Sequence, residues 1–328
     1  MMRKTLAAAL LFVCLLSGTA LAHHAPGPVG VGLAGPLLTN SASTLEMRGL
    51  AITIQSSYVN LNPFSDSEML GFAEEGHDVH TFDYLYTVSA GIAYGITDNL
   101  TLSLKMPYIS FNNIREAHAE EHGEEGGEEH AEVHVRGDSS GIGDITVLGQ
   151  YRFLKQDSRQ LESSVIFGLK VPTGITDEED ENGEKFDTEF QPGSGSWDPI
   201  IGLAVTKRFG RVSFDADARY TLVTEGSQDT DLGDLFNYDL AVSYHIPGRL
   251  RTDLVLELNG EWKQKQEVDG DEDDSSGEHV MYLSPGVRIG FGKTSSAFLS
   301  AGIPVIQDMN GKQSETDYRL FFGFSIGL

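Results

Sequence analysis

A period-two alternation of apolar and polar residues recurs along most of the chain after residue 47 and constrains its fold more than any other feature. In residues 212–222, for example, every second residue is apolar, and the residues between them are polar or charged. Such alternation is typical of β-strands with one apolar and one polar face. We expect twelve strands, near residues 48–59, 80–96, 99–112, 141–154, 162–173, 198–208, 211–223, 235–246, 251–263, 279–292, 296–306 and 317–328.

The connections between these strands alternate in length. The long ones are 60–79, 113–140, 174–197, 224–234, 264–278 and 307–316, and the short ones are 97–98, 155–161, 209–210, 247–250 and 293–295. Outer-membrane barrels have short periplasmic turns and longer extracellular loops. We therefore predict an all-β fold, a transmembrane antiparallel up-and-down β-barrel of about 12 strands with N- and C-termini periplasmic. A soluble all-β protein also has alternating strands, but it does not account for this asymmetry of the loops.

The N-terminal residues indicate export. Arg3 and Lys4 precede an apolar run, and Ala20-Leu21-Ala22 offers small residues for cleavage, so residues 1–22 resemble a secretory signal peptide. No later apolar run is long enough for a transmembrane helix, and only helices and closed barrels satisfy all backbone groups in hydrocarbon. We divide the remainder into a periplasmic N-terminal segment, 23–47, and an outer-membrane β-barrel, 48–328, of a Gram-negative-type bacterium, in contact with outer-membrane lipids and lipopolysaccharide.

Charge and cysteine content exclude several functions. The chain has 49 Asp and Glu residues against 23 Lys and Arg, a formal net charge of −26, so nucleic acid is a poor partner. Its single cysteine, Cys14, lies inside the signal peptide. A metal site in the remainder must therefore use His, Asp or Glu.

The loop 113–140 has an unusual composition. Between Glu116 and His134 it holds eight Glu, four His and no Lys or Arg, and a His-x-x-x-His spacing occurs twice. In a helical turn, residues four apart share a face, so each pair could bind one ion together with a carboxylate. We predict a site for Zn, Ni or Cu ions, with no cofactor required; the alternative is a solvated acidic loop. The candidate ligands are His118, His122, His130, His134, Glu120, Glu121 and Glu132, with His77 and His80 from the first outer loop.

The polar faces of the strands carry both signs of charge. These residues either pair across a narrow interior or line a water-filled path, and the sequence does not distinguish a plugged lumen from an open one. Ser243 and His245 share one strand face, but no nucleophile motif surrounds them, so we do not expect an enzyme. The predicted luminal residues are Lys105, Arg152, Lys170, Asp215, Asp217, Arg219, Asp239, Glu257 and Arg288.

Three glycine-rich segments resemble a known family. They are Gly141-Ile142-Gly143-Asp144, the stretch from Gly168 to Gly174, and Gly193-Ser194-Gly195-Ser196. Together they resemble the outer-membrane β-barrel transporter family named for the meta-pathway of phenol degradation, over most of residues 45–328. The resemblance implies a barrel and suggests passage of a small-molecule solute, but it carries over no substrate. Leu328 departs from the aromatic residue that commonly ends such barrels.

These observations favour an outer-membrane channel for small solutes whose outer loops bind divalent metal ions. One alternative is an uptake channel for small hydrophobic or aromatic compounds, in which the His/Glu-rich loop is incidental. Another is a surface binding or structural barrel that does not conduct. The sequence does not fix the oligomeric state.

Overall fold

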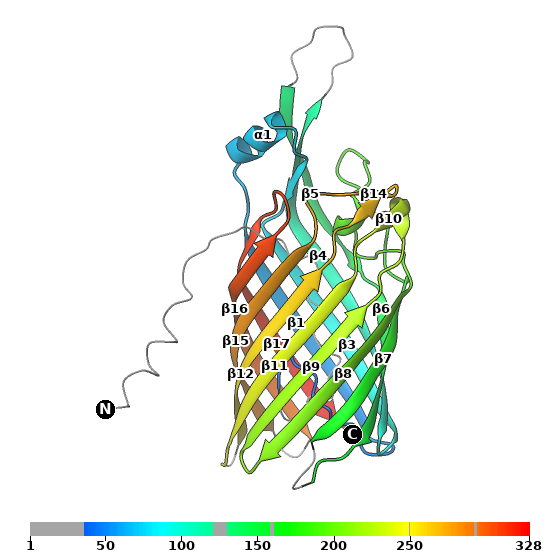
Figure 1. The fold of residues 1–328 in the computed structure, drawn as a ribbon, viewed down its shortest axis with the longest axis vertical. Coiled ribbons are helices and arrows are strands. Elements are labelled where there is room, and N and C mark those ends of the chain that lie inside the picture. Colours follow the sequence, from blue (N-terminus) through cyan, green and yellow to red (C-terminus); the bar gives the residue numbers. More distant parts are fainter. Residues whose placement is uncertain (1–35, 121–129, 158–160, 249, 292–293) are drawn as a thin grey trace, which may run out of the picture.

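In the computed structural model, twelve long antiparallel strands close into a barrel (Figure 1). The structure describes residues 36–120, 130–157, 161–248, 250–291 and 294–328. Each strand pairs with its neighbours in the chain, and β17 pairs with β1 to complete the circle. The barrel strands are β1 (Leu50–Asn62), β3 (Tyr84–Thr97), β4 (Leu100–Glu120), β6 (Ile145–Leu154), β7 (Glu162–Val171), β8 (Asp198–Phe209), β9 (Val212–Thr221), β11 (Leu235–Ile246), β12 (Arg251–Lys263), β15 (Glu278–Phe291), β16 (Ser295–Met309) and β17 (Glu315–Gly327). All twelve predicted strands are confirmed.

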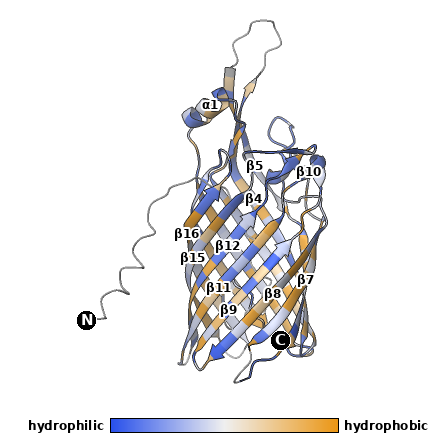
Figure 2. Ribbon diagram, in the orientation of Figure 1, coloured by the Kyte–Doolittle hydropathy of each residue, from blue (hydrophilic) through white to orange (hydrophobic). Residues whose placement is uncertain are grey.

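Hydrophobic and hydrophilic residues alternate along the barrel strands (Figure 2), and their exposure is the reverse of that in a soluble protein. In β9, Phe214 and Tyr220 are exposed on the outside, whereas Asp215, Asp217 and Arg219 are buried inside. An apolar exterior suits contact with lipid, and a polar interior is usual in outer-membrane barrels. Within the described residues, no helix is long and apolar enough to span a membrane.

The long connections gather at one end of the barrel, and the short turns lie at the other end with the C-terminus (Figure 1). The elements at the long-loop end are α1 (Asp66–Glu74), β2 (Val79–Thr81), β5 (His130–Ile142), η1 (Thr188–Phe190), η2 (Ser227–Asp229), β10 (Thr230–Asp231), β13 (Glu267–Val268) and β14 (Asp271–Glu272). Helix α1 begins with a capping box, in which Ser65 and Glu68 bind each other's backbone N–H. Its residues Met69 and Ala73 pack against Ala117 of β4.

The helical turns expected in the loop 113–140 are wrong for the described residues. Strand β4 continues to Glu120, and β5 begins at His130 and pairs with it. On the other edge of β4, residues 115–117 pair with β2. The physical reason is that residues 115–117 pair on both edges and residues 118–120 continue the same ladder with β5, so the extended backbone is already hydrogen-bonded where a helix was expected.

Residues 36–47, here termed the luminal segment, do not all lie in the periplasm as expected. Leu37, Leu38 and Ala42 are buried inside the barrel, whereas Met47 lies near the turn between β3 and β4 and bonds to Asp98. The earlier part of the expected periplasmic segment, like residues 1–22, lies outside the described residues. The segment enters the lumen because charged residues of the barrel wall bind its backbone, as described next.

Candidate functional site

Charged residues of the same strand and of neighbouring strands pair along the luminal face of the barrel wall. Arg219 donates from Nε to Asp217 (2.8 Å) and from Nη2 to Asp239 (3.1 Å). Asn259 donates to the other oxygen of Asp239 (2.8 Å) and accepts from Arg319 (3.2 Å). The structure thus brings three of the predicted luminal residues into one hydrogen-bonded network.

The luminal segment is held by three further contacts with predicted luminal residues. Glu257 accepts the backbone N–H groups of residues 37–39 at 3.0 to 3.1 Å. Asp217 accepts from the backbone and side-chain amides of Asn40, at 2.7 and 3.1 Å. Arg288 donates to the backbone carbonyl of Pro36 at 2.7 Å. Hydrogen bonds to charged groups are the stronger kind, so these residues anchor the segment rather than line an open path.

Apolar contacts complete this anchor. Leu37 and Leu38 pack against Val255, Phe298 and Phe321, which point into the barrel from β12, β16 and β17. The sequence analysis missed these residues. Their position on the otherwise polar face of each strand is a signal that could have indicated a buried partner in the lumen.

Two other predicted luminal residues lie nearer the short turns. Arg152 pairs with Glu162 at 2.7 Å. Asp215 accepts hydrogen bonds from the hydroxyls of Thr206 (2.6 Å) and Ser213 (2.7 Å). Neither residue bonds directly to residues 36–40 among the described residues, but their partners Thr206 and Glu162 accept from the backbone of Ala42 (2.9 Å) and the hydroxyl of Ser43 (3.3 Å) in the luminal segment.

A cavity of about 160 Å³ lies at the long-loop end of the lumen. Its apolar surface comes from strands and loops alike, notably Ile109, Leu148, Ile200 and Leu232. Its polar surface includes the predicted luminal residues Lys105, Lys170 and Arg219. Lys170 pairs with Asp198 and donates to Ser194 at 2.7 Å.

The glycine-rich segments hold the loop 174–197 over this cavity. Asp144 accepts the N–H groups of Thr173 (3.0 Å) and Gly174 (2.8 Å), and its second oxygen accepts from the backbone and hydroxyl of Ser194 (2.8 Å each). A Cβ on Gly193 would lie 2.6 Å from the backbone of Gly174, so only glycine permits this approach. Asp144 is a positioning residue that the sequence analysis did not single out.

A larger vestibule of about 740 Å³ opens toward the long loops, and Thr188 and Lys263 line both it and the cavity. Carboxylates dominate its wall. Those that line it are Asp78, Glu116, Asp187, Glu189, Asp271, Glu272, Asp273 and Asp274. The negative charge should raise the local concentration of cations at the entrance.

His80 lies in this vestibule. Its Nδ1 bonds to Glu189 Oε1 at 2.9 Å. Burial opposes a charge on the imidazole, but the hydrogen bond to Glu189 and the carboxylates of Glu189, Glu116 and Asp187 outweigh it and raise the pKa of His80 to about 9.

Among the described residues, the other predicted metal ligands do not gather into one site with His80. His77 is exposed after α1, and His118 and His134 stack across β4 and β5 with ring centroids 5.0 Å apart. Glu132 pairs across the strands with His118. Glu121 and His122 lie outside the described residues, as do the side chains of Glu120 and His130, whose backbones pair. The four-histidine site therefore stays a prediction.

Ser243 and His245 do not form a nucleophile and base pair. His245 Nδ1 bonds to Asp253 at 2.8 Å, and Ser243 Oγ has no hydrogen-bond partner among the described residues.

A closed twelve-stranded barrel with an apolar exterior and a charged, partly filled lumen defines an outer-membrane β-barrel. The comparison with known families agrees. The chain belongs to the family described as putative MetA-pathway of phenol degradation, whose profile matches residues 78–308.

Solved structures support the fold. An outer membrane channel from Pseudomonas putida F1 superposes with a TM-score of 0.60 at 16% identity, over 88% of this chain and 98% of that one. The CymD monoaromatic hydrocarbon channel gives a TM-score of 0.40 at 9% identity, over 86% and 88% of the two chains, which is too distant for any argument. No curated protein matches this chain significantly.

Proposed function

We propose that this chain is an outer-membrane channel that admits small, largely apolar solutes of the size of a single aromatic ring. The cavity at the long-loop end carries the proposal. It has a volume of about 160 Å³ and combines apolar side chains with cationic ones and with the carboxylates of Asp144 and Asp198. In another protein, an apolar cavity of roughly 150 Å³ binds benzene, so one aromatic ring fits a space of this size.

Cationic side chains give the cavity a further means of holding an aromatic ring. Lys105 and Arg219 contribute to its wall beside Ile109, Leu148 and Ile200. A cation over the face of a ring contributes about 0.5–2 kcal/mol, and the apolar residues exclude water from the remainder of the solute.

The order of the spaces along the lumen supports a route. A solute would enter the acidic vestibule, pass Thr188 and Lys263, which line both spaces, and reach the cavity. Below it the luminal segment occupies the barrel, bound by Glu257 and Asp217. Passage to the periplasm therefore requires residues 36–40 to move.

The comparisons fit this proposal. The family description refers to phenol degradation, and the Pseudomonas putida F1 protein is described as an outer membrane channel. Metal binding by the His/Glu-rich loop is a separate proposal, favoured by the stacked pair of His118 and His134. A barrel without conductance is the competing possibility, favoured by the buried luminal segment.

Adjacent residues of β8 provide a matched test. Ile200 lines the cavity, whereas Ile201 is 63% exposed on the lipid-facing side. We expect Ile200→Trp to fill the cavity and reduce initial uptake of radiolabelled phenol by expressing cells severalfold, and Ile201→Trp to leave uptake unchanged. Equal uptake by both variants and the parent would show that the cavity is not the route. Equal uptake by cells with and without the chain would favour the non-conducting barrel.

A further inference from the structure

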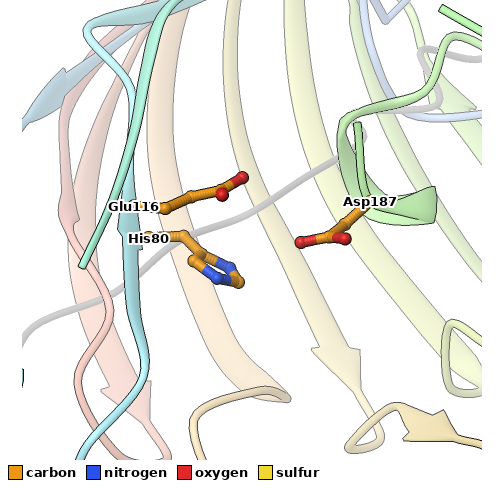
Figure 3. Close-up of side chains that lie close together, drawn as sticks. All are labelled: His80, Glu116 and Asp187. Carbon is orange, nitrogen blue, oxygen red and sulfur yellow. The ribbon is translucent and has the colours of Figure 1, made fainter. Parts of the chain in front are cut away.

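We propose that His80, Glu116 and Asp187 bind a divalent transition-metal ion in the outer vestibule. The three side chains come from β2, from β4 and from the residue before η1, and they point toward one another (Figure 3). One possible ligand atom of each lies within 4.8 Å of those of the other two. Ligands that each lie about 2 Å from one ion are at most about 4 Å apart, so binding would draw these side chains slightly closer together.

Glu116 supplies evidence independent of this spacing. Its side chain is only 8% exposed, and its Oε2 accepts from Arg136 Nη1 at 2.7 Å. Its other oxygen, Oε1, is buried and has no hydrogen-bond partner among the described residues. A buried carboxylate oxygen without a partner is costly, and a bound cation would satisfy it.

Neighbouring groups hold the ligands as the second shell of a metal site does. Glu189 binds Nδ1 of His80 at 2.9 Å, which leaves Nε2 of a neutral imidazole with a lone pair for a metal. Arg136 fixes Glu116 and is itself bound by Asp180 at 2.9 Å. Carboxylate–histidine pairs of this kind commonly orient metal-bound imidazole.

The ligand set selects the class of ion. One imidazole nitrogen and two carboxylates suit Zn²⁺, Ni²⁺ or Cu²⁺, whereas Ca²⁺ and Mg²⁺ prefer ligands that are all oxygen. Asp187 is exposed to the vestibule, so an ion can enter, and water can complete its coordination. The remaining carboxylates of the vestibule would attract cations to the site.

The site would connect two parts of the outer surface. Glu116 belongs to the β4–β5 hairpin, and Asp187 precedes Thr188, which lines both the vestibule and the cavity. A bound ion would fix the loop over the cavity to the barrel wall. Without a metal, a protonated His80 would balance the negative charge of the same carboxylates. This protonated state competes with the metal-bound state.

The test uses the full chain, purified and folded, in which His118, His122, His130 and His134 are replaced by Ala to remove binding by the His/Glu-rich loop. Zn²⁺ is titrated by calorimetry into this parent and into two variants of it, one that also carries His80→Gln and one that also carries Asp187→Asn. We expect one Zn²⁺ per chain in the parent and at least tenfold weaker binding in both variants. Ca²⁺ should bind at least tenfold more weakly than Zn²⁺.

Asp78→Asn is the matched control, because Asp78 lines the same vestibule and lies outside the cluster of three. Its Zn²⁺ affinity should equal that of the parent. Equal weakening by Asp78→Asn and Asp187→Asn, or no Zn²⁺ binding in the parent, would overturn the proposal. Cu²⁺ bound to the parent should show coupling to a single nitrogen by electron paramagnetic resonance. If this coupling persisted in His80→Gln, the proposal would also be overturned. None of these outcomes depends on solute uptake.

Discussion

Replacing Glu257 by Gln should release the luminal segment. The carboxylate accepts three backbone N–H groups, from residues 37–39, at 3.0 to 3.1 Å. Hydrogen bonds to a charged acceptor contribute about 1.5–3 kcal/mol each, against about 0.5–1.5 kcal/mol for a neutral one. Three bonds weakened by about 1 kcal/mol each give about 3 kcal/mol, which lowers the ratio of docked to released segment by about a hundredfold.

Single-channel recording in planar bilayers measures this change directly. We expect Glu257→Gln to open more often or to conduct more than the parent. Glu261→Gln is the matched control, because Glu261 lies on the same strand, bonds to Asn237 at 2.6 Å and does not contact the segment by any described hydrogen bond. An independent readout is a cysteine at Ala42, which is fully buried. A maleimide should label it faster when Glu257 is replaced.

Unchanged conductance and unchanged labelling in Glu257→Gln would refute the view that this carboxylate holds the lumen closed. An equal effect of Glu261→Gln would attribute the change to luminal charge instead. Circular dichroism checks that each variant keeps the folded barrel. A variant that loses the fold reports on stability and not on the position of the luminal segment.

Three further predictions concern the lumen and the topology. In Gly286→Leu, whose Cβ would lie 2.3 Å from Leu37 Cδ1, the segment should be displaced and conductance should rise; an unchanged conductance would show that the wall yields instead. Asp217→Asn should reduce the cation preference measured by reversal potential, because it removes a luminal negative charge, and an unchanged reversal potential would place the ion path elsewhere. Protease added to intact cells should cut within residues 174–197, and a cut only within 155–161 would reverse the orientation.

The strands were predictable because their information is local. Alternation along each segment specifies which face meets lipid, as Phe214 and Asp215 show in β9. Loop lengths then specify the order of up and down strands. The same alternation placed Asp217, Arg219 and Asp239 on one luminal face, where they do meet.

The metal-binding geometry was only partly predictable. A spacing of four residues suggested helical turns, but the local hairpin of β4 with β5 and the non-local pairing of β4 with β2 override it. His80 was identified as a candidate ligand from its expected place in the first outer loop. Its neighbours Glu116 and Asp187 lie on other elements, so no spacing along the chain could reveal their proximity.

The luminal segment could not be predicted from its own residues. It lacks the alternation of a strand and the length of a transmembrane helix. The available signal was indirect and lay in its partners, the inward apolar residues Val255, Phe298 and Phe321.

The order of assembly follows from where the luminal segment binds. Its bonds to Asp217 and Glu257 span 177 and 220 positions of the chain, and its bond to Arg288 spans 252. Contacts between such distant residues form slowly, and the pocket for residues 37–39 exists only after β12 has paired with β11 and β15. The luminal segment precedes every barrel strand in the chain and should nevertheless be fixed after them. A newly inserted barrel should therefore conduct more before this segment docks than after it.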